Sequence, residues 1–271
     1  MMNAEEIKQE LGIILENRSA KIWASRYPKK QIKHVFFDFD GVILKEYGIH
    51  EQAYAWIIKS LIEENFDIKI DPDEALICEA REIRKVIKGK SPDEKLSFLI
   101  SYYSKGQKAF TTVEKLNKKW MEYLRSNVKK AYGGDASLYL LDGARDLVTN
   151  CAEHSKIYGL TANYQDQAEW LMKFVGLNSY FKKIYGYPIK GNKELSKAKI
   201  LSGVIQKYKL DPEEICFIGD GKPDIISGNK NGVYSVGVAN TVENGVVLLG
   251  ENPDALISSP MAFVDLLNVI F

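Results

Sequence analysis

The sequence predicts an α/β protein in which an all-helical block interrupts a parallel sheet. After residue 137, short apolar segments rich in strand-forming residues alternate with amphipathic segments. Such alternation is typical of a parallel sheet with helices on its faces. A further strand-like segment, residues 35–37, is separated from the others by the helical pattern of residues 47–136. The simplest arrangement is one α/β domain with a helical domain inserted after its first strand.

Residues 1–30 are predicted to form an N-terminal helical extension. Apolar side chains recur at helical spacing at Ile7, Leu11, Ile14 and Leu15. The first residues include acids where a signal peptide carries lysines, and no apolar run approaches the roughly 18 residues that span a bilayer. We therefore expect a cytoplasmic protein without a membrane partner, and the sequence assigns the extension no function.

The core is predicted to begin at residues 31–46. Residues 35–37 (Val-Phe-Phe) are continuously apolar, which indicates a buried strand, and they run into a turn at residues 38–41 (Asp-Phe-Asp-Gly).

Residues 47–136 are predicted to be helical throughout. Segments 71–74 and 91–94 each combine an N-cap residue, a proline and an acid, and segment 111–114 repeats the capping box without the proline. Gly133 and Gly134 close this block.

Residues 137–271 are predicted to complete the sheet. The expected strands are 157–160, 184–185, 215–218, 234–238 and 255–257.

Composition excludes several classes of protein. The 37 basic and 36 acidic residues give a net charge of +1, which argues against a nucleic-acid or anionic-membrane partner. The three cysteines, Cys78, Cys151 and Cys216, show no C-x-x-C spacing, so the sequence indicates neither a zinc site nor a disulfide framework. Oligomeric state cannot be read from these numbers.

Polar residues follow three of the predicted strands. In an open parallel sheet ligands bind beyond the carboxyl ends of the strands, so these side chains are candidate site residues. Clustered carboxylates repel one another, and a hard cation such as Mg²⁺ is their natural partner. Together with Lys197, which opens the helix before the strand at 215–218, the candidates are Asp38, Asp40, Thr161, Asn163, Asp220 and Asp224.

An aspartate nucleophile with a cation, a lysine and a hydroxyl donor is the equipment of phosphoryl transfer. Residues 38–42 (Asp-Phe-Asp-Gly-Val) resemble the D-x-D-G-[VT] first motif of the haloacid dehalogenase-like hydrolases. Thr161 resembles their second motif, and residues 219–224 (Gly-Asp-Gly-Lys-Pro-Asp) resemble their G-D-x-x-x-D fourth motif. The third motif is a lysine at the start of a helix. Lys197 fits the spacing of the phosphoserine-phosphatase branch, with Lys199 and Lys193 as alternatives.

The resemblance implies a Rossmann-like core, residues 31–46 and 137–271, and a C1 cap, residues 47–136, as in the phosphoglycolate-phosphatase and β-phosphoglucomutase branches. It also implies roles for the candidates. Asp38 is the expected nucleophile and Asp40 the acid and base, while Lys197 and Thr161 hold the phosphoryl oxygens. The expected Mg²⁺ ligands are Asp38, the Asp40 carbonyl and Asp220, with Asp224 supporting the site. Asn163 is either a phosphate contact or a turn residue.

Asp40 distinguishes the activities found in this family. Dehalogenases of the family lack this second aspartate, so the resemblance implies a phosphatase acting on a small phosphorylated metabolite, such as a sugar phosphate or a phosphoglycolate-like compound. A phosphosugar mutase is the alternative, because His50 lies twelve residues after Asp38 as in β-phosphoglucomutases. Segment 45–46 (Lys-Glu) and Gly219 depart from the mutase pattern, however. A non-catalytic binding module is a third possibility, which the intact set of acids opposes.

A cap loop is expected to bind the part of the substrate that is distal to the phosphate. Lys88 and Lys90 flank Gly89 just before a capped helix, and this segment resembles the specificity loop of the β-phosphoglucomutase branch. A solvated turn between helices is the alternative, in which case specificity is expected from Arg81, Arg84 and Lys85.

Overall fold

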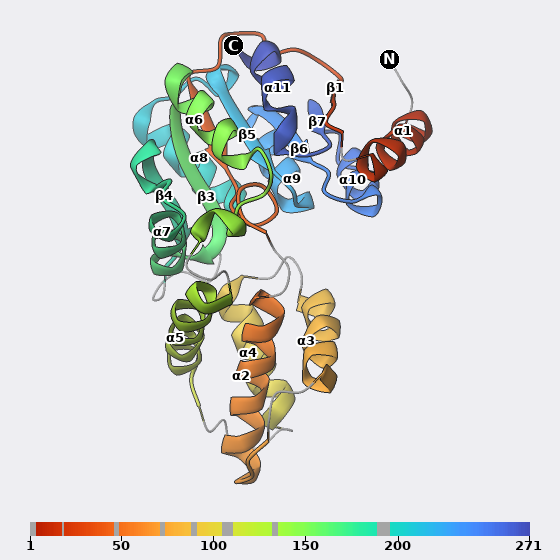
Figure 1. Ribbon diagram of the computed structural model, residues 1–271. Helices are drawn as coiled ribbons and strands as arrows, with labels where there is room; N and C mark the ends of the chain where they lie inside the picture. Colours follow the sequence, from red (N-terminus) through yellow and green to blue (C-terminus); the bar gives the residue numbers. More distant parts are fainter. Residues whose placement is uncertain are drawn as a thin grey trace. The chain divides into compact units, whose positions relative to one another are not determined.

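The chain folds into two compact units in the computed structural model (Figure 1), which describes residues 4–17, 19–45, 49–70, 74–87, 91–104, 111–131, 135–188 and 196–271. The first, called the sheet unit, comprises Met1–Lys45, Ser137–Pro188 and Glu194–Phe271. The second, called the helical unit, comprises Glu46–Ala136 and Ile189–Lys193.

The sheet unit is built on a seven-stranded sheet in the order β1-β7-β6-β5-β2-β3-β4. All neighbouring strands are parallel except β1 and β7, which pair antiparallel. This arrangement confirms the predicted α/β fold with its parallel sheet. The strands are β1 (Ile22–Ala24), β2 (His34–Phe37), β3 (Lys156–Tyr164), β4 (Phe181–Tyr187), β5 (Ile215–Gly219), β6 (Tyr234–Val238) and β7 (Ala255–Ile257).

Helices follow or precede nearly every strand of this sheet, as expected where parallel strands need crossover connections. Helices α8 and α9 pack against each other, and α6 packs against α11. The helices are α1 (Ala4–Glu16), α6 (Ala144–His154), α7 (Gln165–Phe174), α8 (Lys197–Tyr208), α9 (Lys222–Asn231), α10 (Val242–Leu249) and α11 (Phe263–Ile270).

Strand β1 was not expected from the sequence. Its three residues pair with β7 at Ile22↔Ile257, Trp23↔Leu256 and Ala24↔Ala255. A segment this short, with only its central tryptophan buried, carries no alternation that could reveal a strand. The N-terminal extension therefore contributes an edge strand to the sheet as well as helix α1.

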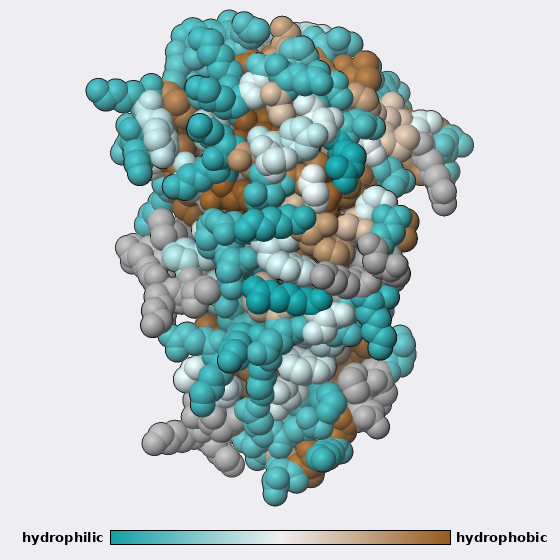
Figure 2. All heavy atoms as spheres, turned by 60° about the vertical axis from the view of Figure 1, so that its left-hand side comes forward, coloured by the Kyte–Doolittle hydropathy of each residue, from teal (hydrophilic) through white to brown (hydrophobic). Residues whose placement is uncertain are grey.

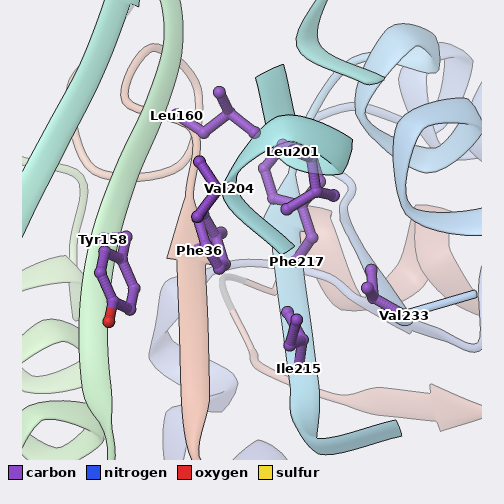
Figure 3. Packing of buried hydrophobic residues seen from close by; sticks show 8 residues of the cluster. All are labelled: Phe36, Tyr158, Leu160, Leu201, Val204, Ile215, Phe217 and Val233. Atoms are coloured by element: carbon purple, nitrogen blue, oxygen red, sulfur yellow. The ribbon is translucent and has the colours of Figure 1, made fainter. Parts of the chain in front are cut away.

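The core of the sheet unit fixes α8 over the two central strands (Figure 3). Leu201 and Val204 of α8 belong to one buried cluster with Phe36 of β2 and Phe217 of β5. Tyr158, Leu160, Ile215 and Val233 complete that cluster. Because α8 leads into β5 by a short connection, the helix runs back along the sheet and begins near the carboxyl ends of the strands. The first side chain of α8 is therefore placed at that edge.

The helical unit consists of α2 (Ile49–Phe66), α3 (Glu74–Ile87), α4 (Pro92–Ser104) and α5 (Val113–Ala131), and its described residues contain no strand. Helix α4 begins with the predicted capping box. The Ser91 amide donates to Glu94 at 2.8 Å, and the Glu94 amide donates to Ser91 Oγ at 3.3 Å. At α5 the prediction was one residue early, because Thr112 rather than Thr111 caps the helix through Lys115 N at 3.3 Å. The predicted cap at residues 71–73 lies outside the described residues.

The face of the protein shown in Figure 2 is largely hydrophilic, with smaller hydrophobic areas among the hydrophilic residues. Among the described residues, no helix combines the length and the apolar character that crossing a membrane requires.

Candidate active site

The loop after β2 carries the first two acids. Asp38 and Asp40 flank Phe39, which is fully buried and packs edge to face against Phe181 with ring centroids 5.5 Å apart. Gly159 of the neighbouring strand makes room for this ring, since a Cβ at residue 159 would lie 2.4 Å from the Phe39 ring. The buried aromatic ring therefore anchors the loop between the two acids.

Strand register brings the other candidates to the same edge. Phe37 of β2 is paired with Gly159 of β3 on one side and with Ile218 of β5 on the other. Thr161 and Asp220 each lie two residues beyond these partners. Parallel pairing thus places polar residues from three adjacent strands at one end of the sheet, as the sequence predicted.

Lys197 lies between two carboxylates. Its Nζ is 2.6 Å from Asp38 Oδ2 and 2.6 Å from Asp224 Oδ1. A cation at the first position of a helix is disfavoured by the helix dipole, and both carboxylates offset that cost here. Ser196 caps the helix by accepting from Lys199 N, which fixes the position of the lysine between them.

The second loop, after β5, brings Asp220 against Gly41. Gly41 has a left-handed backbone with φ +73°, and a Cβ at this position would lie 2.2 Å from Asp220 Oδ2. Glycine is therefore required both by the turn and by the space that the Asp220 carboxylate occupies. Gly219 has a similar role beside Asp224, since a Cβ there would lie 2.3 Å from the Asp224 Cβ.

The three carboxylates form a candidate metal centre. One oxygen from each of Asp38, Asp220 and Asp224 can be chosen so that all three lie within 4.8 Å of one another. Oxygen-only donors of this kind suit a hard divalent cation. Asp224 also has structural partners, because its Oδ1 accepts from Lys197 and its Oδ2 accepts from the Gly221 amide at 3.0 Å.

Burial changes the protonation behaviour of this cluster. Burial raises the pKa of Asp38 to about 7, because it outweighs the nearby Lys197 charge, and the Asp224 and Asp40 carboxylates raise it further. Burial alone would lower the pKa of Lys197, but Asp224 and Asp38 more than compensate and raise it. One lysine thus faces two buried carboxylates, and the cluster favours additional positive charge.

Thr161 and Asn163 meet the same site from β3. Thr161 is 2% exposed, and its Oγ1 accepts from the Asn163 amide at 3.2 Å. The Asn163 side chain donates to Asp40 Oδ2 at 2.8 Å. Asn163 therefore holds the second acid of the loop in place.

Of the remaining predicted residues, the structure describes Lys199 only. Lys199 is exposed on α8, so of the described candidates Lys197 alone meets the acids. Lys193, Lys88 and Lys90 lie outside the described residues, as does the His50 side chain.

Two asparagines near the site were missed by the sequence analysis. Asn240 Nδ2 donates to the Gly41 carbonyl at 2.6 Å, and Asn244 Nδ2 donates to the Asp220 carbonyl at 2.7 Å. Asn240 follows β6 at the carboxyl edge, so the rule that identified the other candidates also applies to it. Asn244 lies within α10, where no sequence signal separates it from a solvated residue.

Fold and site together define a class of protein: an α/β enzyme with an acidic, lysine-bridged centre at the carboxyl edge of a parallel sheet. A family model described as haloacid dehalogenase-like hydrolase matches residues 32–232. The chain therefore belongs to the haloacid dehalogenase-like hydrolases, and the prediction of an enzyme of this family is confirmed.

Individual relatives are distant. A phosphoglycolate phosphatase of Synechococcus elongatus is 27% identical over 136 residues, which is 49% of this chain and 60% of that protein's own length. A Clostridium perfringens protein with the provisional name pyrophosphatase PpaX is 23% identical over 238 residues, covering 88% of this chain and 98% of that protein. The crystal structure of β-phosphoglucomutase from Clostridium difficile has a TM-score of 0.62 at 20% identity, covering 88% of this chain and 97% of that one. This last similarity shows the fold alone.

Proposed function

We propose that this protein is a Mg²⁺-dependent phosphatase that hydrolyses a small phosphorylated metabolite through an aspartyl-phosphate. The observation that carries the proposal is the position of Asp38, which is buried directly after β2 with its Oδ2 2.6 Å from Lys197 Nζ. A carboxylate held next to a fixed cation is suited to attack a phosphoryl group whose negative oxygens need compensation.

In the proposed first step, an Asp38 oxygen attacks phosphorus and the bond to the leaving oxygen breaks. Asp40 donates a proton to that oxygen, and the Asn163 side chain, 2.8 Å away, orients Asp40 for the transfer. In the second step Asp40 takes a proton from a water molecule, which attacks phosphorus and releases phosphate from Asp38. Both residues return to their starting state.

Lys197 and Thr161 are the proposed holders of the phosphoryl oxygens. Lys197 is fixed by two carboxylates, so it can bind an anion without reorganising. Thr161 Oγ1 accepts from the Asn163 amide, which leaves its O–H to donate to an oxygen of the substrate.

The residues present fit a bound Mg²⁺. Asp38, Asp220 and the Asp40 carbonyl would hold it, with Asp224 supporting Lys197 and the Gly221 loop. When bound, the ion supplies positive charge that neutralises the transferring phosphoryl group.

The experiment that tests the proposal uses Asp38→Asn, which keeps the shape of the side chain but removes the nucleophile. Released phosphate is measured over a panel of phosphorylated metabolites, with Mg²⁺ and with excess chelator. We expect the variant to lose more than about a thousandfold in turnover, and the wild type to lose activity in chelator. A variant that kept a tenth of wild-type activity would refute the covalent mechanism, and full activity in chelator would refute the metal requirement.

The substrate class is inferred from the relatives and from the sequence. The names of both curated relatives denote enzymes that act on phosphate compounds. We propose a sugar phosphate or a phosphoglycolate-like compound, with Lys88 and Lys90 contacting its distal part.

A phosphosugar mutase is the second candidate, favoured by the place of His50 twelve residues after Asp38. Acid-quench analysis of products from a hexose 1-phosphate separates the two. A hexose 6-phosphate as the main product would establish the mutase, and free phosphate with hexose would establish the phosphatase.

A further inference from the structure

The N-terminal segment lies outside the family match, which begins at residue 32. It is nevertheless part of the sheet unit. Helix α1 packs against α10, and β1 extends the sheet beside β7 (Figure 1). Leu11 and Trp23 from this segment share a buried cluster with residues of the sheet and its helices: Ile225, Ala239, Leu248 and Leu256.

The contact between α1 and α10 is closely fitted. Leu11 is fully buried, and a Cβ added at Gly245 of α10 would lie 2.3 Å from Leu11 Cδ2. Glycine at this position therefore allows the two helices to approach with the leucine between them. A side chain at residue 245 would require the Leu11 side chain or helix α1 to shift.

A second contact fixes the segment from the strand side. Lys21 N donates to Ser258 Oγ at 2.9 Å, and Ser258 N donates to the Lys21 carbonyl at 3.0 Å. Arg26 pairs with Asp254, whose buried carboxylate also accepts from Ser235 N of β6 at 2.8 Å. The segment thus holds β7 and β6, the strand that leads into α10.

Asn244 of α10 and Asn240, which precedes the N-cap residue of that helix, contact the two acidic loops of the site. Asn240 donates to the carbonyl of Gly41, in the loop of Asp38 and Asp40, and Asn244 donates to the carbonyl of Asp220. Thr241 caps α10 through Asn244 N at 3.1 Å, which fixes the asparagine relative to the start of the helix. A shift of α10 would therefore be transmitted to both acidic loops.

We infer that the N-terminal segment is a positioning element of the metal site: Leu11 holds α10 through Gly245, and Asn240 and Asn244 transmit that position to the loops of Asp38 and Asp220. The inference rests on the proposed function for the identity of the ion. Asn240, Asn244 and Leu11 act through the acids and touch no reacting atom.

The test measures Mg²⁺ binding by isothermal titration calorimetry on the full chain, without substrate. We expect Asn244→Ala to weaken binding by about tenfold or more, as for other residues that support metal ligands. Gly245→Ala is expected to weaken it as well, and Leu11→Ala in the same chain to restore part of the loss, because the smaller side chain makes room for the new methyl group.

A matched control separates positioning from a general loss of stability. Leu171 of α7 is fully buried like Leu11, and α7 packs on β4, at the opposite edge of the sheet from β1. Leu171→Ala and Leu11→Ala are compared at temperatures where both are folded by circular dichroism. Of these two variants, we expect only Leu11→Ala to weaken Mg²⁺ binding.

The outcomes are distinguishable. If the wild type binds Mg²⁺ and Asn244→Ala and Gly245→Ala bind it equally well, the inference is overturned and the proposed function stands. Equal weakening in Leu11→Ala and Leu171→Ala also overturns it, because the segment then contributes stability alone. A wild type that binds no Mg²⁺ overturns the metal site of the proposed function and this inference with it.

Discussion

At the scale of single residues, the central feature of the site is Lys197, a largely buried lysine that pairs with two carboxylates. Lys197 compensates part of the charge of Asp38 and Asp224, and burial leaves the pKa of Asp38 near 7. The folded-state pKa is thus above the ordinary value of 3.8. The stability that this proton contributes is present below about pH 4 and is lost as the pH rises through 7. A bound cation would take over the role of the proton.

This gives a prediction for metal binding. Mg²⁺ should displace the Asp38 proton, so its affinity should rise with pH between about 6 and 8, with up to one proton released per ion near pH 7. Calorimetry in two buffers of different ionisation enthalpy measures the released protons. We expect the release to disappear at pH 9 and in Asp38→Asn. A heat of binding independent of the buffer at pH 7 would contradict the raised pKa.

The sequence could predict these residues but not all their contacts. The strand ends and motif spacing indicated Asp38, Asp40, Thr161 and Asp220, and the helix start left three lysines open. Of these lysines, the structure describes Lys197 and Lys199. The packing of α8 on Phe36 and Phe217 selects Lys197, because it directs the first side chain of the helix to the acids. Asn244 was beyond prediction, since its role depends on how α10 lies against the loop after β5.

At the scale of elements, the two acidic loops depend on glycine where they meet. Gly41→Ala should fail for two reasons: its φ of +73° is strained for alanine, and the new Cβ would lie 2.2 Å from Asp220 Oδ2. We expect a loss of about 1–3 kcal/mol in the free energy of unfolding and at least about a tenfold rise in the Mg²⁺ concentration for half-maximal activity.

Gly176 provides the matched control. It has a similar φ of +71°, but nothing lies within 4 Å of a Cβ built there. Gly176→Ala should therefore lose stability to a similar degree, as measured by chemical denaturation, and keep its Mg²⁺ requirement. If both variants changed the metal requirement equally, the contact between Gly41 and Asp220 would not be the cause.

Prediction from the sequence succeeded for elements with a long or strongly apolar pattern. The six strands from β2 to β7 lie where apolar segments indicated them, although β3 and β4 extend further than expected. Strand β1 was missed because its pairing with β7 is a tertiary contact of three residues. Local patterns do not encode contacts between segments more than 200 residues apart in the chain.

At the scale of the whole molecule, the candidate site residues that the structure describes are confined to one of the two units. The sheet unit contains the described residues of the candidate site: Asp38, Asp40, Thr161, Asn163, Lys197, Asp220, Asp224, Asn240 and Asn244. The chemistry of phosphoryl transfer can therefore be argued from that unit by itself. We propose that the helical unit recognises the rest of the substrate, and the sequence offers Lys88 and Lys90 as the candidate residues.

The last prediction tests, by kinetics, the proposed recognition of the substrate by the helical unit. If Lys88 and Lys90 contact the distal part of the substrate, Lys88→Ala and Lys90→Ala should raise KM for the true substrate by about tenfold. They should change the kinetics of p-nitrophenyl phosphate little, because that compound offers the helical unit almost nothing to bind. Lys118→Ala, at an exposed lysine of α5, is the control for lost surface charge and should affect neither substrate. Small, equal effects of all three variants would mean that specificity must come from elsewhere, with Arg81, Arg84 and Lys85 of α3 as the next residues to replace.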